Sequence, residues 1–579
     1  MPETLDETYA RTLEEIDEQN WEYAHRLFQC VAAASRPLLV SELAEFLAFD
    51  FEAESTPTFL IDWRPEDPTN TVLSICSSFL AVVKRLDGSP VVQFAHFSVK
   101  EYLTSARLAK ANDTISRFQI SMTAAHTIVA QGCLGVLLHL DENVTRDSLE
   151  KFPLAEYAAE HWMGHARTEH VSSNVQEGMK RLFDPNRSHL SVWVWIYDCE
   201  EPMHIRFKPI KKDRLALHYA AFYGLHDVIK FLIVERSQDV NARGFNKKET
   251  SFHVASRRGH KDVVQLLLEH GADANSRDDD QCMPLHLALR GGHQEIAWVL
   301  LEHCMDTEVR DNWKCTPLFL ASQIGHVELA QALLEKGAET EARDNRKLTP
   351  LLLASRNGHV ELARVLLEKG ADTEARDTFE NTSLLLASEH NHVALAQVLL
   401  KHGAEAELQD NRKCTPLLLA TQNRHLELAR VLLEHGVDTE ARNILERTPL
   451  LLASLFGFAE LVQVLLEHGA DAKALGVKGR TSLHQASEHG HAAAVQVLLE
   501  HGVDANARDT NSATPLHLAS RPMYRHRGHP EVVGLLLRYS SDVHARDDKS
   551  QTPLMGARAK GDQVIMQLLS DYEEQGRAM

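Results

Sequence analysis

The sequence has few cysteines and no long apolar segment, and both shortages exclude whole classes of protein. Only eight of its 579 residues are cysteine and no two form a Cys-x-x-Cys pair, so we expect neither a disulfide framework nor a zinc site. The longest apolar run, 128–140, is far shorter than the roughly 20 residues that a bilayer-spanning helix needs. The first twenty residues carry seven acidic groups and lack the apolar core of a secretory signal. We therefore expect a protein of the cytoplasm, with the nucleus as the alternative.

Positive charge is also scarce. The 61 Lys and Arg residues are outnumbered by 82 Asp and Glu residues, which gives a net charge of -21. Such a surface repels phosphate backbones and anionic lipid, so we expect neither nucleic acid nor a membrane as partner. Three motifs do not occur: Gly-x-x-x-x-Gly-Lys-Ser/Thr, Gly-x-Ser-x-Gly and His-Glu-x-x-His, which mark phosphate loops, serine hydrolases and zinc proteases. We predict no catalytic residues, no cofactor and no metal, and therefore a protein that is not an enzyme.

What the sequence does contain is a repeat of 33 residues. The tetrad Thr-Pro-Leu-His or a variant of it recurs at this spacing from Thr250 to Thr514. A degenerate copy begins at Leu215 and a last copy at Thr552, which makes eleven units between about Arg214 and Ser570. A regular period of this length is typical of solenoid proteins.

Each unit encodes two short helices. In the copy at Thr349, the threonine suits the N-cap of a helix and Pro350 suits its first turn. Gly358-His359 separates this helix from a second apolar helix, which ends at the C-cap residue Gly370. An extended loop follows, and we call its turn the tip of the unit. One helix pair cannot bury its own apolar face, whereas stacked pairs can, so the pattern predicts a mainly α solenoid of helix-turn-helix units with hairpin loops.

The units resemble ankyrin repeats. The resemblance rests on Thr514-Pro515-Leu516-His517, on Gly325-His326 and on 465–471, which read Leu-Leu-Glu-His-Gly-Ala-Asp. It implies the ankyrin fold, with protein binding through the tips and the exposed face of each first helix. Five extra residues near 521–527 should form a bulge. Five successive units have an apolar residue in place of the tetrad histidine, and we expect an apolar contact between units there: Phe319, Leu352, Leu385, Leu418 and Leu451.

Histidine is abundant, with 33 residues, and metal binding is the obvious alternative to a structural role. Six of these histidines recur once per unit at the start of the second helix: His260, His293, His326, His359, His392 and His425. Because this recurrence follows the fold period, we interpret them as structural residues and not as zinc or copper ligands.

The tips carry side chains that the fold does not require. Three residues before successive tetrads, apolar and basic residues alternate: Trp313, Arg346, Phe379, Arg412, Leu445 and Lys478. Exposed aromatic and arginine side chains are typical of binding hot spots. Ile444, Leu455 and Phe456 add apolar side chains to the same region, and we predict that these nine residues contact a protein partner. An alternative is that Trp313 and Phe379 fold back over neighbouring tips and that Phe458 only fills the position of the usual histidine.

The first 210 residues lack the period. Helices are expected at 5–18, 21–34 and 40–49, and they are followed by apolar runs at 72–83 and 91–97. Asp87-Gly88 lies between the two runs and favours a hairpin. Helices followed by a hairpin is the order of a winged helix, and the acidic composition indicates a packing module in place of a DNA-binding one.

This segment also has a resemblance, carried by four stretches: 5–11 (Leu-Asp-Glu-Thr-Tyr-Ala-Arg), 35–38 (Ser-Arg-Pro-Leu), 76–80 (Cys-Ser-Ser-Phe-Leu) and 95–103 (Ala-His-Phe-Ser-Val-Lys-Glu-Tyr-Leu). They are similar to the winged helix of fungal NACHT-ankyrin proteins, which are STAND-class NOD-like receptors. The winged helix is sometimes labelled after GPI inositol-deacylase, a label that implies no activity here. Residues 154–162 and 193–197 resemble the helical connector of those receptors, and we expect Trp193 to pack against the first repeat unit.

The domain organisation follows. We predict a winged-helix-like domain at 1–110, a helical connector at 111–210 and an ankyrin solenoid at 211–579. The phosphate-binding loop of the receptor family does not occur in the sequence, so the nucleotide-binding engine is absent from this chain. Two functions remain open. The chain is the sensing half of a receptor, coupled in cis or in trans to a nucleotide-binding module, or it is a free-standing scaffold or adaptor.

Overall fold

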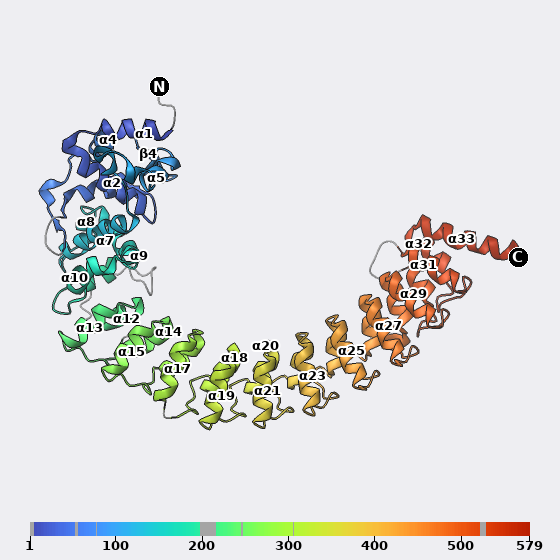
Figure 1. Ribbon diagram of the computed structural model, residues 1–579. Helices are drawn as coiled ribbons and strands as arrows, with labels where there is room; N and C mark the ends of the chain where they lie inside the picture. Colours follow the sequence, from blue (N-terminus) through green and yellow to red (C-terminus); the bar gives the residue numbers. More distant parts are fainter. Residues whose placement is uncertain are drawn as a thin grey trace. The chain divides into compact units, whose positions relative to one another are not determined.

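The computed structural model describes residues 5–51, 56–76, 78–196, 216–244, 247–304, 306–521 and 528–578. They form two compact units, Met1–Asp279 and Asp280–Met579, each built mainly from helices (Figure 1). The predicted first anchor, Leu215, lies outside the described residues, as does most of the predicted insertion at 521–527.

The N-terminal part of the first unit is a winged-helix domain. Its elements are α1 (Leu5–Glu14), η1 (Glu18–Asn20), α2 (Trp21–Ala33), β1 (Leu38–Leu39), α3 (Val40–Glu45), η2 (Phe46–Ala48), β2 (Phe49–Asp50), β3 (Thr58–Phe59), η3 (Ile61–Trp63), α4 (Pro68–Cys76), β4 (Leu80–Lys84), β5 (Pro90–Phe94) and α5 (Phe97–Leu103). The sheet is antiparallel in the order β1-β5-β4, with Val82 and Leu38 opposite Val92. The predicted hairpin is confirmed, and Gly88 takes a φ of 85° at its turn.

Three predicted boundaries in this domain are wrong. The first helix ends at Glu14 instead of residue 18, and the apolar run at 72–83 is helical up to Cys76 before it becomes β4. The third helix ends at Glu45 and continues only as the 3-10 segment η2. Its end is fixed from outside, because the Glu45 carboxylate accepts a hydrogen bond from the Leu154 backbone N–H at 2.7 Å and pairs with Arg64. Such a tertiary contact leaves no local signal in the sequence.

The connector wraps around one central helix. Its elements are η4 (Leu108–Lys110), α6 (Asp113–Ser116), α7 (Met122–His139), α8 (Arg146–Leu149), α9 (Leu154–Ala166), α10 (Ser172–Phe183) and α11 (His189–Ile196). By length and composition alone, α7 could cross a membrane, but half of it is buried in the unit. It packs against α2, α9 and α10, which is the position of a core helix.

A buried histidine joins the connector to the winged helix. His165 on α9 is 1% exposed, and its Nε2 lies 2.9 Å from the Tyr157 hydroxyl and 3.4 Å from the Ser35 hydroxyl. Its Nδ1 lies 2.9 Å from Nδ1 of His126 on α7. Burial lowers the pKa of His165 to about 4, so the ring is neutral near pH 7. The network therefore links α7, α9 and the loop after α2 through neutral groups.

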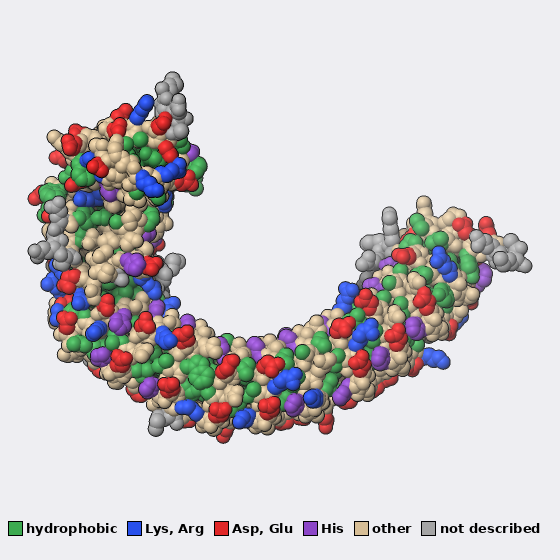
Figure 2. Space-filling view, viewed as in Figure 1, with side chains coloured by type: hydrophobic (Ala, Val, Ile, Leu, Met, Phe, Trp, Pro, Cys, Tyr) green, Lys and Arg blue, Asp and Glu red, His purple; other side chains and the backbone are tan. Residues whose placement is uncertain are grey.

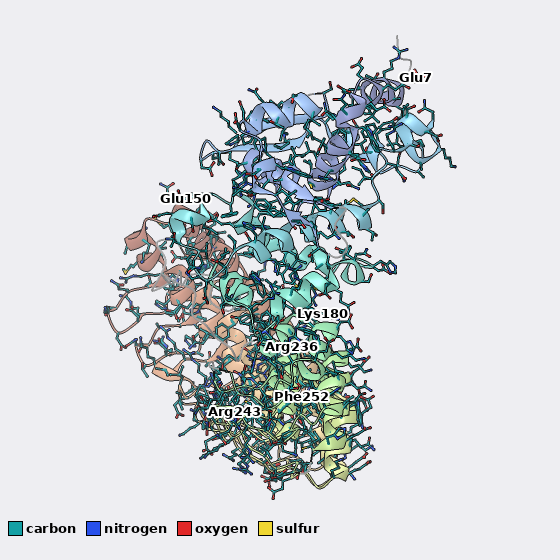
Figure 3. The ribbon with its side chains drawn as sticks, turned by 90° about the vertical axis from the view of Figure 1, so that its left-hand side faces the viewer. Glu7, Glu150, Lys180, Arg236, Arg243 and Phe252 are labelled. Atoms are coloured by element: carbon teal, nitrogen blue, oxygen red, sulfur yellow. The ribbon has the colours of Figure 1, made fainter. Side chains whose placement is uncertain are left out.

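The connector also receives the first helix pair, as predicted. The Trp193 ring on α11 lies 5.9 Å from the Tyr219 ring on α12 (Ala216–Tyr223). Arg236 follows α13 (His226–Val234) and pairs with Asp184 at 2.9 Å. Lys180 on α10 lies near Arg236 in the same contact (Figure 3). The first pair thus buries its outer face on the connector.

The described part of the repeat region contains eleven helix pairs. Two belong to the first unit, α12 with α13 and α14 (Ser251–Arg258) with α15 (Lys261–Glu269). Nine belong to the second unit, where the first helices form one layer and the second helices the other (Figure 1). The first helices are α16 (Pro284–Arg290), α18 (Pro317–Ile324), α20 (Pro350–Asn357), α22 (Ser383–Glu389), α24 (Pro416–Gln422), α26 (Pro449–Phe456), α28 (Ser482–His489), α30 (Pro515–Ser520) and α32 (Pro553–Lys560). The second helices are α17 (Gln294–His303), α19 (Val327–Glu335), α21 (Val360–Glu368), α23 (Val393–Lys401), α25 (Leu426–Glu434), α27 (Ala459–Glu467), α29 (Ala492–Glu500), α31 (Pro530–Arg538) and α33 (Gln563–Ala578).

The tetrad residues cap the first helix of a repeat and contact the next repeat, as predicted. Thr349 caps α20, because its hydroxyl accepts the Leu352 N–H at 3.3 Å. Where the tetrad histidine is present, its ring bonds the next tip, as His484 Nε2 does with the Ala513 carbonyl at 3.1 Å. In the central units the replacing residue is buried, and Leu385 packs in a cluster with Cys414 and Leu418. The predicted exchange of a polar contact for an apolar one is confirmed.

The tips are rigid turns bonded to one another. The Asp344 carboxylate accepts the N–H groups of Arg346 and Leu348 at 2.8 Å each and so closes its own tip. The Asn345 N–H donates to the Trp313 carbonyl of the preceding tip at 3.1 Å, and the same bond recurs along the row. Each tip side chain is therefore held at a fixed place relative to its neighbours.

One buried ion network lies between two adjacent repeats of the second unit, near its C-terminal end. Arg480 is 9% exposed in its side chain and pairs with Glu488 of α28 and, at 3.5 Å, with Asp509 of the next tip. Both carboxylates are buried. A buried carboxylate that loses its cation pays a large desolvation cost.

We expect Arg480→Met to destabilise α28 and α30 by about 3 kcal/mol or more, because two buried carboxylates lose their partner. Hydrogen exchange measured by mass spectrometry would report this as faster exchange in these two helices. Arg447→Met is the matched control, since Arg447 occupies the same position one repeat earlier and has no ion-pair partner in the described residues. Equal exchange in the two variants would contradict the prediction.

Candidate partner-binding surface

Seven of the nine predicted partner-binding residues lie along the row of tips in the second unit, and Leu455 and Phe456 lie at the end of α26. Trp313, Phe379 and Leu445 are all about half exposed. Acidic and basic side chains are interspersed over the visible face of this unit (Figure 2). The predicted residues therefore form local features on a surface of mixed charge, and they fall into three groups.

Trp313 is partly occupied by its own chain. The guanidinium of Arg290, at the end of α16, lies 4.6 Å from the centroid of the Trp313 ring. Arg290 also pairs with Asp311, the residue that closes this tip. The ring thus packs against a neighbouring helix end, so the alternative of an intramolecular role applies in part to Trp313.

Three other predicted residues meet in one groove of about 510 Å³. Arg346, Phe379 and Arg412 come from three successive tips and form its outer side. The ends of α20 and α22 form its inner side, with Arg356 and Glu389. Arg412 is tied down, because its Nε donates to the Asp410 carboxylate at 3.0 Å and Glu389 lies 3.9 Å away. The structure therefore brings tip residues and helix-end residues to one site, as the resemblance implied.

The third group of predicted residues is apolar. Ile444, Leu445 and Phe456 are between 44% and 56% exposed, and Leu455 is half-buried. The next tip adds two residues that sequence reasoning missed, Leu475 at 54% and Val477 at 53% exposed. We call the five exposed residues the apolar patch: Ile444, Leu445, Phe456, Leu475 and Val477.

The missed residues had a signal in the sequence. Leu475 stands where Arg442 and Arg508 stand in the adjacent repeats. Val477 stands where Ile444 stands in the preceding repeat and Thr510 stands in the following one. The comparison along all the tips used only the residue three before each tetrad, and Ile444 was selected as the neighbour of Leu445, so the equivalent position in the next tip was passed over. Lys478, which it did select, is exposed at the edge of the apolar patch.

The tip that carries Leu475 and Val477 has its own backbone geometry. Gly476 stands where the other tips of the second unit have a closing aspartate or, at Asn443, an asparagine, and Lys478 takes a φ of 64° within the 3-10 turn η5 (Val477–Gly479). In the described chain, the Val477 N–H makes no bond to the Leu445 carbonyl, although this bond joins neighbouring tips elsewhere in the row. The apolar patch thus spans the one described break in the row from Asp280 to Asn511.

The histidines at the second-helix starts support the surface from beneath. His392 Nε2 donates to the Arg356 carbonyl at 3.1 Å, and His491 Nε2 donates to the Leu455 carbonyl at 3.0 Å. A Cβ added to Gly358 would lie 2.5 Å from the His392 ring, at a φ of 77° that already favours glycine. Four of the six predicted histidines make this bond and hold helix ends of adjacent repeats together: His260, His359, His392 and His425. In the described structure, the buried Nε2 of His326 has no hydrogen-bond partner.

Phe458 fills the position of one such histidine, as the alternative proposed. Its ring lies 5.6 Å from the Phe456 ring, and the Arg424 guanidinium lies 5.5 Å from its centroid. Phe458 is half-buried, so it supports Phe456 and does not itself add to the exposed surface.

Metal-binding chemistry has no visible site in the described part of the chain. No group of three His, Cys, Asp or Glu side chains there is placed to hold an ion. Burial raises the pKa of Cys315 to about 12 and that of Cys414 to about 11, so these two thiols beside the tips stay protonated near pH 7. The surface offers aromatic, aliphatic and guanidinium groups, which is the chemistry of protein recognition.

Comparison with known protein families agrees with this architecture. The sequence profile of ankyrin repeats in three copies matches 217–311, 303–377, 371–443 and 440–509, and a single ankyrin repeat matches 511–548. The winged helix domain of GPI inositol-deacylase matches 14–118. Ankyrin repeats and a winged helix thus account for most of the chain.

Three known proteins are similar to parts of this chain. The azaphilone pigments biosynthesis cluster protein L of Monascus ruber is 32% identical over 293 residues, which cover 47% of this chain and 60% of that protein. A BTB/POZ domain and ankyrin repeat-containing protein of Oryza sativa subsp. japonica is 41% identical over 13% of this chain and 15% of its own length. Alpha-latrocrustotoxin-Lt1a of Latrodectus tredecimguttatus is 39% identical over 12% of this chain and 5% of its own length. The chain therefore spans less than two thirds of each of these relatives.

We expect the apolar patch to be dispensable for folding. The triple variant Ile444→Asn, Leu475→Arg and Val477→Thr introduces residues found at the same positions in adjacent repeats. Because the three side chains are exposed, the variant should keep the free energy of unfolding within about 0.5 kcal/mol. Thermal melting followed by circular dichroism checks this. Leu451→Asn, at a buried position, should lower the midpoint clearly, and a triple variant that melts as early as Leu451→Asn would show that the patch belongs to the core.

Proposed function

The chain belongs to the ankyrin-repeat proteins, whose profile matches 217–509, just over half of its 579 residues, and we propose that it binds a protein ligand through the apolar patch and the adjacent tips. The ankyrin architecture is a protein-interaction module and is typically non-catalytic. We propose accordingly that this chain is not an enzyme and uses no cofactor of its own.

The apolar patch is the observation that carries this proposal. A solvent-exposed group of large apolar side chains serves no purpose in an isolated solenoid, and such groups mark interaction sites. The rest of the tip row supplies arginine and aromatic residues, which contribute most of the binding energy at protein interfaces. The rigid tips add a second advantage, because side chains that are already ordered lose little entropy when a partner binds.

We further propose that the chain is the sensing half of a STAND NOD-like receptor. The matched winged helix occurs in fungal NACHT proteins, and its resemblance to the segment behind their nucleotide-binding domain supports this assignment. Ligand binding by the repeats would act through the connector, which contacts both the winged helix and the first helix pair. The nucleotide-binding module would be supplied in cis or in trans, in the cytoplasm.

The alternative is a free-standing scaffold or adaptor, in which the winged helix docks one protein and the repeats another. The 5′ end of the native transcript separates the two. A reading frame that continues upstream into Gly-x-x-x-x-Gly-Lys-Ser/Thr supports a receptor in cis. A transcript that starts at Met1 removes that form and favours the adaptor.

We expect Phe456→Asp to abolish binding of the protein ligand, because a carboxylate within the apolar patch would have to be desolvated. The partner is first identified by capture on the wild-type chain and then purified, so that its dissociation constant can be measured by calorimetry. The helical circular dichroism signal should not change, since Phe456 is exposed.

Gln463→Asp is the matched control, because Gln463 is exposed on the second helix of the same repeat, away from the tips. It should leave the dissociation constant unchanged. If Phe456→Asp binds the purified partner as tightly as the wild type does, the apolar patch is not the binding site.

A further inference from the structure

The groove between the tips of Arg346, Phe379 and Arg412 has a mixed lining. Its volume of about 510 Å³ is large enough for two or three amino-acid side chains. Leu348 and Leu386 lie buried beneath it, and the half-exposed Phe379 ring forms an apolar wall. The remaining lining is charged, so the groove's specificity depends on which of those charges are already paired.

The carboxylates of the groove are committed to its own structure. Asp377 is buried, and its carboxylate accepts the N–H groups of Phe379 and Asn381 at 2.8 and 2.9 Å. Asp410 is also buried and binds the Arg412 side chain as well as two backbone N–H groups of its own tip. These two carboxylates therefore accept the hydrogen bonds that close the tips, and they are buried away from a ligand in the groove.

Two of the three guanidinium groups that line the groove are unpaired in the described structure. Arg412 is held by Asp410 and lies near Glu389. Arg346 and Arg356 are exposed, and neither side chain has an ion-pair or hydrogen-bond partner anywhere in the described ranges. They come from a tip and from the end of α20, so they approach the groove from its two sides. Unpaired arginines beside an aromatic ring are a local positive site on a chain whose net charge is -21.

We propose that this groove binds an acidic segment of the protein ligand, with an Asp or Glu carboxylate between Arg346 and Arg356 and an adjacent apolar side chain on Phe379. The inference rests on the proposed function and names the chemistry of the partner. Guanidinium groups bind carboxylates with paired, charge-assisted hydrogen bonds. The overall negative charge does not prevent this, because charges beyond a screening length of about 8 Å contribute little at physiological salt.

A phosphate is the other anion that guanidinium groups bind. Glu389 lines the same groove, and its contact with Arg412 at 3.9 Å is longer than a hydrogen-bonded pair. A phosphate group carries close to two negative charges, so its attraction to the arginines and its repulsion from Glu389 both exceed those of a single carboxylate. A phosphorylated segment is therefore an outcome that the test must be able to detect.

Short random peptides displayed on phage are selected on the immobilised full chain, and enriched peptides are synthesised for fluorescence anisotropy. We expect enrichment of Asp or Glu next to an aromatic or aliphatic residue. The double variant Arg346→Glu/Arg356→Glu should weaken binding of these peptides at least about tenfold, since two attractive charges become repulsive. Replacing the peptide's Glu by Gln should weaken binding to the wild-type chain in the same way.

Arg343→Glu is the matched control, because Arg343 is exposed on the same tip region but does not line the groove. It should leave the dissociation constants unchanged. Four outcomes overturn the proposal: no enriched peptide, enriched peptides without acidic residues, acidic peptides that bind the double variant equally, or a phosphoserine peptide that binds about tenfold tighter than its Glu counterpart. Peptides that ignore the double variant but are lost in Phe456→Asp would leave the proposed function standing and remove only the groove.

Discussion

The structure of the second unit depends on one constraint, which is that no helix pair can bury its apolar face without its neighbours. Burial of a leucine contributes about 1.5–3 kcal/mol, and a hydrogen bond contributes about 0.5–1.5 kcal/mol net. The replacement of the tetrad histidine by Leu352, Leu385, Leu418 and Leu451 therefore keeps the contact between units while it changes its chemistry. The central tips then rely on their aspartates and on tip-to-tip bonds for their shape, and this leaves their side chains available for a partner.

The strongest departures from the repeat pattern coincide in one place. Gly476 stands where the other tips of the second unit have a closing aspartate or asparagine, Leu475 replaces an arginine and Val477 stands where the next repeat has Thr510. Three residues after Val477, Arg480 enters the core and needs Glu488 and Asp509 to compensate its charge. A tip without its aspartate is destabilised locally, whereas the buried ion network is costly to break. A buried ion network thus follows directly after the tip that adds Leu475 and Val477 to the apolar patch.

Most of the fold could be predicted from the sequence, because the 33-residue period repeats the same caps and apolar positions many times. The winged-helix boundaries could not be predicted as well, since α3 ends where Glu45 meets Leu154, over a hundred residues away. The candidate site was predictable where comparison of equivalent positions sufficed, as for Phe379 and Leu445. The site was not predictable where the role of an arginine depends on whether its guanidinium group already has a carboxylate partner. Arg346 and Arg412 look alike in the sequence, yet only Arg412 has such a partner in the described structure.

In the proposed binding mode, this difference in pairing separates two kinds of contact along the tip row. The apolar patch supplies buried area, which contributes affinity but accepts many partners. The groove supplies unpaired guanidinium groups, which reject ligands without a matching charge because charge complementarity mainly determines specificity. Arg412 lies between them: it lines the groove, and its carbonyl accepts the Ile444 N–H at 3.0 Å, which joins the groove to the apolar patch. A ligand that follows consecutive tips would therefore meet the charged site and the apolar site in a fixed order, so its own sequence should carry the acidic and the apolar groups in matching order.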